Sequence, residues 1–269
     1  MKNKILSNFY ELFKLDVKKQ IEYKSAFYFD IIASILRFFV IKFLWEFIFK
    51  LVGESTIRGF MLEEMIFYVA CSFACIPLLR IHAVQKVERE IQTSKINVWF
   101  TKPINYLNFI KMSSITISFF YFCINFSFFL ILAYIFLPSI QISILNILMF
   151  LVMSIAIYFV ILNIKSMVAL IAFWTTSVWG INYFVTQIIF VFSGGLVPLT
   201  FFPDNVVTIL KYLPFYYMNY SAVSILLFGS DLNFFIKSIS ILLIFGFIVR
   251  LLLNKFYKHA IKKLDGLGG

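Results

Sequence analysis

The chain has 269 residues, of which 62% are hydrophobic, 20% are aromatic and only 14% are charged. Soluble domains average about 45–50% apolar and about 25% charged residues, so this chain has too few charged side chains to cover itself with a surface that faces water. Although its formal net charge is +11, this composition excludes a soluble enzyme, a disordered protein and a nucleic-acid-binding domain. It predicts an all-α membrane protein that crosses the bilayer several times.

The first 25 residues mix basic and apolar side chains before any long apolar segment begins. Ile5, Phe9, Leu12 and Phe13 recur at the spacing of one helix face. We expect residues 1–25 to form an amphipathic helix that lies on the cytoplasmic surface of the membrane. A solvated basic tail is the alternative.

Six segments long and apolar enough to cross about 30 Å of hydrocarbon follow within residues 26–254. The third and fourth segments carry no charged residue, whereas the second is the weakest because only its central part is free of charge. The predicted spans are 26–51, 62–83, 112–137, 140–164, 167–192 and 235–253.

The distribution of Lys and Arg between the connecting segments predicts the orientation. Eighteen basic residues lie on one predicted side and four on the other, with Lys165 assigned to the loop between the fourth and fifth spans. Basic residues concentrate in cytoplasmic loops. We therefore expect both termini in the cytoplasm, which agrees with six spans, and residues 255–269 as a basic cytoplasmic tail.

Charged residues lie inside the first predicted span. Asp30 and Arg37 are seven residues apart and share about one helix face, whereas Lys42 and Glu46 are one turn apart and could pair directly. Two interpretations of Arg37 remain open. Its charge is merely tolerated by snorkelling and pairing, or it faces a subunit interface or an aqueous substrate path.

Residues 85–103 form the largest charged element between predicted spans. A short helix here would place an apolar face on the membrane protein and a charged face toward a soluble partner, and a solvated connector is equally compatible with the pattern. The candidate partner-binding residues are Glu88, Arg89, Glu90 and Lys95.

Residues 193–233, predicted on the outer side, are too apolar for a loop exposed to water. We expect a re-entrant or surface-lying segment of broken helices, because glycines and prolines interrupt it. This segment either forms an outer gate or merely anchors the fifth and sixth spans. The candidate gate residues are Gly194, Gly195, Pro198, Pro203, Pro214 and Phe215.

Motifs for enzymatic chemistry are absent from the sequence. There is no GxxxxGK[ST] phosphate-binding loop, no HExxH, no GxSxG and no paired carboxylates. Cys71, Cys75 and Cys123 lack CxxC spacing, and no His lies near them to complete a metal site. We expect neither a catalytic site nor a metal or cofactor in this chain.

Several short motifs, in their order along six spans, resemble the ABC-2-type transporter permeases, the membrane subunits of bacterial ABC exporters. The stretch Ser193-Gly194-Gly195-Leu196-Val197-Pro198-Leu199, with Phe202-Pro203 and Leu213-Pro214-Phe215 after it, is similar to the family's S-G-x-x-x-P-L…P…L-P-F pattern. Glu63-Glu64-Met65 with Tyr68, and Phe100-Thr101-Lys102-Pro103, resemble two further elements. Ser94 stands where a Gly usually precedes the latter element.

The resemblance covers nearly the whole chain and implies partners. It implies a separate ABC ATPase dimer, a second permease that is identical or homologous, and a coupling helix within residues 85–103 that docks onto the ATPase. It places the protein in the bacterial cytoplasmic membrane, among lipids and without nucleic acid. Relatives handle peptides, drugs, lipids and glycans, so the cargo stays open.

Two functions follow from these expectations. The first is a permease subunit that exports an amphipathic or hydrophobic cargo. The alternative is a membrane accessory or immunity protein that binds a partner without transporting anything.

Overall fold

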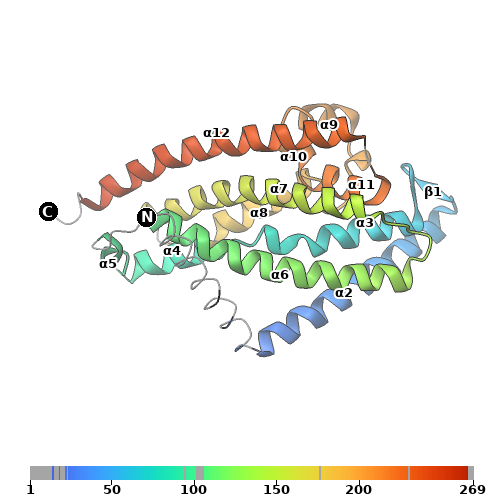
Figure 1. The fold of residues 1–269 in the computed structure, drawn as a ribbon, viewed down its shortest axis with the longest axis horizontal. Coiled ribbons are helices and arrows are strands. Elements are labelled where there is room, and N and C mark those ends of the chain that lie inside the picture. The colour runs from blue at the N-terminus through green and yellow to red at the C-terminus, as the bar shows by residue number, and fades with distance from the viewer. Residues whose placement is uncertain are drawn as a thin grey trace.

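The computed structural model describes Lys14, Lys18, Glu22 and residues 24–93, 95–100, 106–175, 177–229 and 231–265. In these residues the chain is a bundle of helices, most of which run along the long axis of the molecule (Figure 1). A short antiparallel hairpin of β1 (Thr56–Ile57) and β2 (Phe60–Met61) is the one sheet in the described part of the chain. The amphipathic helix predicted over residues 1–25 lies almost entirely outside the described residues.

Three helices of the described chain are long and apolar enough to cross a membrane. They are α6 (Tyr106–Phe136), α7 (Ile144–Leu170) and α12 (Leu232–Asp265). At about 1.5 Å per residue, each is longer than the roughly 30 Å of hydrocarbon that a span must cross. They confirm the spans predicted at 112–137, 140–164 and 235–253. α12 also continues through most of the predicted basic tail.

The first predicted span is one continuous helix, α2 (Lys24–Val52), which packs against α3 and α6. Large apolar side chains remain exposed on its outer face, and Phe29, Val40 and Leu51 are 72%, 64% and 70% exposed. In a membrane, a surface of this kind faces lipid or another protein.

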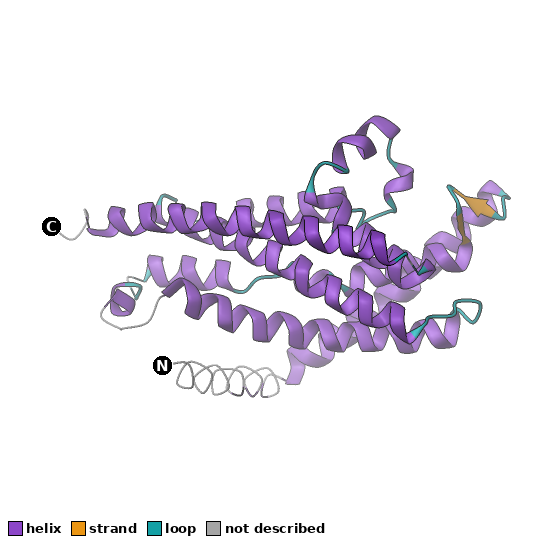
Figure 2. Cartoon of the chain, turned by 45° about the horizontal axis from the view of Figure 1, so that its top comes forward, coloured by secondary structure: helices purple, strands orange, loops and turns teal. Residues whose placement is uncertain are grey.

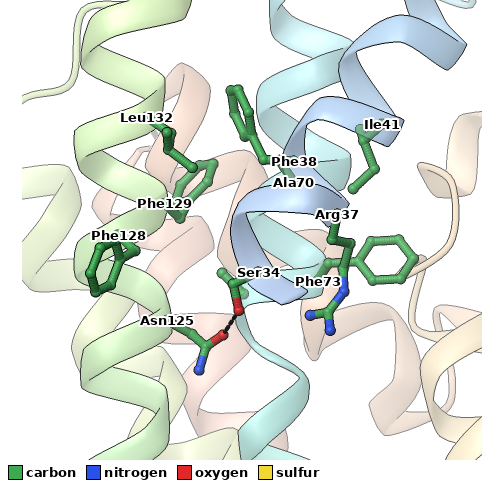
Figure 3. Close-up of a pocket in the computed structure, with 11 residues that line it drawn as sticks. Ser34, Arg37, Phe38, Ile41, Ala70, Phe73, Asn125, Phe128, Phe129 and Leu132 are labelled. Atoms are coloured by element: carbon green, nitrogen blue, oxygen red, sulfur yellow. Dashed lines mark hydrogen bonds between the residues drawn. The ribbon is translucent and has the colours of Figure 1, made fainter. Parts of the chain in front are cut away.

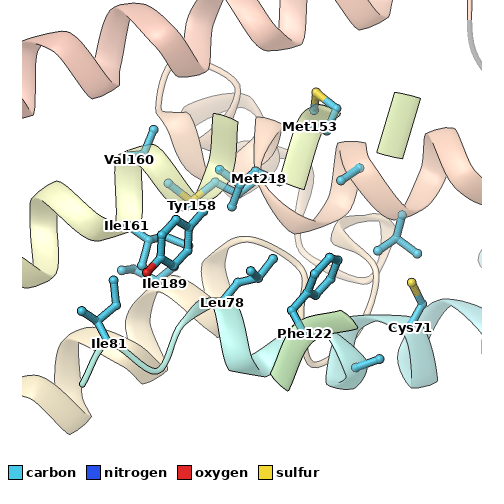
Figure 4. Packing of buried hydrophobic residues seen from close by; sticks show 14 of the residues in the cluster. Cys71, Leu78, Ile81, Phe122, Met153, Tyr158, Val160, Ile161, Ile189 and Met218 are labelled. Carbon is cyan, nitrogen blue, oxygen red and sulfur yellow. The ribbon is translucent and has the colours of Figure 1, made fainter. Parts of the chain in front are cut away.

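The second predicted span, 62–83, is not a continuous helix. α3 (Leu62–Ala74) has 13 residues, and the 3-10 turn η1 (Ile76–Leu78) follows it because Pro77 has no backbone N–H to extend the α-helix. α3 is nevertheless buried along most of its length. Figure 4 shows Cys71 of α3 in the same apolar core as Phe122 of α6 and Met153 of α7.

The predicted boundary between the fourth and fifth spans is wrong. Residues 167–173 belong to the end of α7 and to the turn η2 (Ile171–Phe173), and α8 (Trp179–Phe192) begins only after a break. Hydropathy did not mark this break because the sequence stays apolar on both sides of it. α8 therefore has 14 residues, fewer than a span needs on its own.

Four short helices occupy most of residues 193–233, and prolines stand at the start of three of them. Pro198 and Pro203 precede η3 (Leu199–Phe201) and α9 (Asp204–Leu210), and Pro214 is the first residue of α10 (Pro214–Tyr217). Proline suits these positions because its missing N–H would have no partner there. α11 (Asn219–Phe228) returns the chain into the bundle against α7 and α3.

The connections gather at two opposite ends of the bundle (Figure 1). α4 (Ala83–Gln92), α5 (Asn97–Phe100), the α7–α8 connection and the last turns of α12 lie toward one end, here called the α4 end. The β hairpin, the α6–α7 connection and α9 to α11 lie toward the other, the hairpin end. Figure 2 shows short helices projecting beside the long ones at the hairpin end.

Candidate functional site

A cavity of about 400 Å³ lies where α3 and η1 end and α8 begins. We call it the α8 cavity. Its wall combines aromatic rings with Arg80, His82, Gln85 and Asn182, and none of the described residues that line it is acidic. Arg80 is exposed to this space.

The backbone around the α8 cavity is irregular. α3 stops at Ala74, residues 79–82 between η1 and α4 are not helical, and α8 starts at Trp179. Broken backbone inside a membrane is stable only where it is buried in protein or lines a water-filled cavity, because lipid cannot satisfy its N–H and C=O groups. The end of α3 and the start of α8 thus both lie at a cavity that water can enter.

Lys165 lies directly behind the wall of this cavity. The sequence-based assignment of Lys165 to a loop is wrong, because it lies within α7 and its side chain is fully buried. Its Nζ donates hydrogen bonds to the backbone oxygen of Asn182 at 2.9 Å, to Asn182 Oδ1 at 2.7 Å and to Thr186 Oγ1. Asn182 and Thr186 themselves line the cavity. Within the described chain the ammonium makes no ion pair, so its positive charge is uncompensated.

The predicted intramembrane charges Asp30 and Arg37 do not pair directly. Asp30 Oδ2 accepts a hydrogen bond from Asn125 Nδ2 at 2.8 Å. Asn125 Oδ1 in turn accepts one from the Ser34 hydroxyl (Figure 3). The guanidinium of Arg37 lies 5.9 Å from the ring centre of Phe73. Phe73 also lines the α8 cavity, so Arg37 stands beside that cavity with one aromatic ring between them. The predicted Lys42–Glu46 pair is confirmed.

The α4 end contains the residues predicted to contact a partner, and the structure divides them. Val84 and Val87 bury the apolar face of α4. Glu88 Oε1 accepts a hydrogen bond from the backbone N–H of Val178 at 3.1 Å, immediately before α8 begins. The carboxylate of Glu90 accepts a hydrogen bond from the Tyr106 hydroxyl.

Arg89 and Lys95 are exposed instead, and both line a second, open groove of about 660 Å³ between α4 and α6. The expectation that all four residues form one solvated face is therefore wrong for Glu88 and Glu90, which bond within their own chain. Arg89 and Lys95 are the two predicted residues that remain available to a partner. α4 itself packs against α6, α7 and α8.

The predicted gate residues Gly194 and Gly195 form a tightly packed turn at the end of α8. Gly194 has φ +78°, which favours glycine. Its carbonyl oxygen accepts hydrogen bonds from the buried Tyr68 hydroxyl at 2.8 Å and from Asn219 Nδ2 at 3.3 Å. A Cβ on Gly195 would lie 2.4 Å from the ring of Phe190. The turn is held by α3 and α11, which favours the anchoring interpretation of this segment.

The remaining predicted gate residues lie further along the same segment. Pro198 and Pro214 are buried, whereas Pro203 is exposed. The Phe215 ring is 6.5 Å from that of Phe192 at the end of α8. The structure brings α10, which contains Pro214 and Phe215, into contact with α8, while Pro203 is exposed.

The long apolar helices and this polar cavity between broken ones define a multi-pass membrane protein of the transporter type. A family model described as ABC-2 family transporter protein matches residues 22–268. The chain belongs to that family, and it is the membrane component of an ABC transporter rather than its catalytic subunit. Association with an ABC ATPase follows from membership. No curated protein matches the sequence at a significant level.

Sequence reasoning missed the Lys165 network and the Tyr68–Gly194 bond. A signal for the first was present, because Lys165 is the one charged residue between Lys111 and Asp204. A lone charge in so long an apolar stretch marks a buried, specifically paired group. No sequence signal marked the Tyr68–Gly194 hydrogen bond, since the two residues are 126 positions apart.

Proposed function

We propose that this chain is the permease subunit of a bacterial ABC exporter. It crosses the cytoplasmic membrane six times with both termini in the cytoplasm. The six spans are α2, α3 together with η1, α6, α7, α8 and α12. A second permease, identical or homologous, and a dimer of ATPase subunits complete the transporter. The cargo is amphipathic or hydrophobic.

The observation that carries this proposal is the α8 cavity. Arg80, Gln85, Asn182 and broken backbone face a space of about 400 Å³ that opens at the surface of an otherwise apolar bundle. A protein that only anchors a partner gains nothing from such a space, because polar groups within a membrane are costly. A transporter needs it as the entrance of the cargo pathway.

The exposed faces of α2 and α8 support a second subunit around this cavity. Trp179, Tyr183 and Phe184 of α8 are 65%, 57% and 65% exposed, and α2 also has an exposed apolar face. A second permease that covered these faces would enclose the α8 cavities of both copies in one central space.

The contacts of α4 provide a route by which an ATPase could act on the cavity. Arg89 and Lys95 are exposed for docking, while Glu88, on α4 with Arg89, accepts a hydrogen bond from the N–H of Val178, the residue before α8. A displacement of α4 therefore reaches α8 through a single hydrogen bond and the packing around it. In this account residues 85–103 couple ATP binding to movement of the cavity wall.

The test of this docking surface is capture of the ATPase by the tagged permease from its native membrane. Reversal of charge in Arg89→Glu with Lys95→Glu should reduce capture by about tenfold, because like charges then face each other at the interface. Lys211→Glu is the matched control, since Lys211 is exposed toward the hairpin end. Unchanged capture would place the docking surface elsewhere. If even the unaltered chain captures no ATPase and stays monomeric, the accessory or immunity function replaces the proposal.

The proposed orientation has its own test. Thr93 at the α4 end and Asn205 at the hairpin end are both exposed. Single cysteines at these positions, in a chain without Cys71, Cys75 and Cys123, should react with an impermeant maleimide only from the inside and only from the outside, respectively. External labelling at position 93 would reverse the topology.

A further inference from the structure

We infer that the α8 cavity binds an amphipathic anion, a molecule with one negatively charged headgroup and an apolar body. This inference rests on the proposed transport function and names the class of cargo. Three cationic side chains surround the cavity: Arg80 in its wall, Lys165 behind Asn182, and Arg37 behind Phe73.

The positive charge around the cavity exceeds the negative charge. No acidic residue of the described chain lines the space. Two carboxylates lie near these three cations: Asp30, which accepts a hydrogen bond from Asn125, and Glu88, which accepts one from the Val178 N–H. Because three cations face this region against two carboxylates, an anion that enters the space is favoured over a cation.

The geometry of the cationic groups assigns them different roles. Lys165 donates its hydrogen bonds to Asn182 and Thr186, so it contributes a fixed field but no contact with a ligand. Arg80 is exposed, and within the described chain no hydrogen bond or ion pair occupies its guanidinium. Arg80 is therefore the residue that can donate charge-assisted hydrogen bonds to a carboxylate, phosphate or sulfonate headgroup.

Aromatic side chains supply the site for the apolar body. Trp179 and Tyr183 lie one turn apart on α8, with ring centres 5.9 Å apart and planes inclined by 14°. Both line the cavity, as do Phe73 and Phe190. Flat, exposed rings next to a cationic headgroup site match an amphiphile better than a small inorganic anion, which would gain nothing from them.

Binding of radiolabelled dodecyl phosphate to the permease alone, in phosphatidylcholine nanodiscs, tests this inference. Saturable binding should fall by at least about tenfold in Arg80→Gln, because one charge-assisted contact is lost, and should largely return in Arg80→Lys. Arg58→Gln removes the same charge from the exposed turn of the β hairpin and should leave binding within about twofold of the unaltered chain.

Competitors define the ligand. Dodecyltrimethylammonium, which has the same tail and the opposite charge, and inorganic phosphate should both fail to displace the label. Displacement by phosphatidylglycerol would identify a lipid as the source of the anion, and its failure to displace would identify a smaller organic acid. Equal binding by Arg80→Gln and Arg58→Gln, or displacement by the cationic amphiphile, would overturn the inference.

The ATPase capture described above is scored separately on the same variants. If the unaltered chain captures the ATPase but does not bind dodecyl phosphate, the proposed cargo class is wrong and the transport function stands. Absence of capture in the unaltered chain bears on the transport function alone.

Discussion

The two ends of α8 are built in opposite ways. At its start, a single carboxylate from α4 accepts the Val178 N–H, and Trp179 and Tyr183 stand exposed beside a polar cavity. At its end, the Gly194 turn is buried and tied to α3 and α11 through the Gly194 and Ser193 carbonyl oxygens. The contrast indicates a helix that is fixed at the hairpin end, while its first residues at the α4 end, before Asn182 binds Lys165 of α7, are the free end that can be displaced.

The largest loss of stability is expected from Gly195→Ala at the fixed end. A Cβ there would lie 2.4 Å from the Phe190 ring and 2.7 Å from the backbone oxygen of Phe190, which cannot rotate away. We expect a loss of about 2–3 kcal/mol from overpacking, measured as a lower thermal midpoint and a smaller folded fraction on size exclusion. Gly180→Ala, in the first turn of the same helix with nothing within 4 Å of the new Cβ, should be neutral or slightly stabilising. A folded, fully stable Gly195→Ala protein would refute the rigid turn.

Variants at Gly194 and Gly195 also distinguish the gate interpretation of residues 193–195 from the anchor interpretation. If residues 193–195 are an anchor, variants at Gly194 and Gly195 lose export only in proportion to folded protein. A lower rate of export per folded complex would restore the gate interpretation of this segment.

A milder change at the fixed end is Tyr68→Phe. It removes the buried hydroxyl that donates to the Gly194 carbonyl oxygen and leaves that oxygen with the longer bond from Asn219. We expect a loss of about 1–3 kcal/mol in the free energy of unfolding. Tyr212→Phe, at a position 81% exposed, should change the stability by less than about 0.5 kcal/mol. Equal stabilities of the two variants would show that the hydroxyl does not hold the turn.

The smallest effect is expected at the free end, in Glu88→Ala. Loss of the carboxylate that accepts the Val178 N–H should cost about 1 kcal/mol locally, which appears as roughly fivefold faster hydrogen exchange of the Val178 amide. Arg89→Ala is the control, because Arg89 is exposed and lines the groove between α4 and α6 instead. Identical exchange at Val178 in both variants would remove Glu88 as the link between α4 and α8.

The sequence predicted the long helices well because hydropathy reports directly what lipid requires of a span. α6, α7 and α12 are long, apolar and nearly free of charge in their centres, so their identity did not depend on tertiary contacts. The sidedness of the chain stays a prediction, since it was inferred from basic residues alone.

The broken helices could not be located from hydropathy. α3 ends shortly before Pro77, and α8 starts next to Val178, whose N–H is bound by Glu88 of α4. The surrounding sequence remains apolar in both cases. Lys165 was misplaced for a related reason, because a lysine in a sequence does not reveal whether it is buried or in a loop. Its partners Asn182 and Thr186 are identified only by the structure. Likewise, Glu88 and Arg89 are adjacent in sequence, and only the packing of α4 separates the inward residue from the outward one.

During biosynthesis, α3 and α8 would leave the ribosome as helices of 13 and 14 residues, each too short to cross the hydrocarbon unaided. Each follows a longer helix, α2 or α7, that can enter the membrane first. For α8, the preceding helix also carries the ammonium that binds Asn182 and Thr186. The helix pair α7 and α8 can therefore satisfy its own polar groups as it is inserted. Lys165, Asn182 and Thr186 then enter the bilayer already bonded to one another rather than as separate groups exposed to lipid.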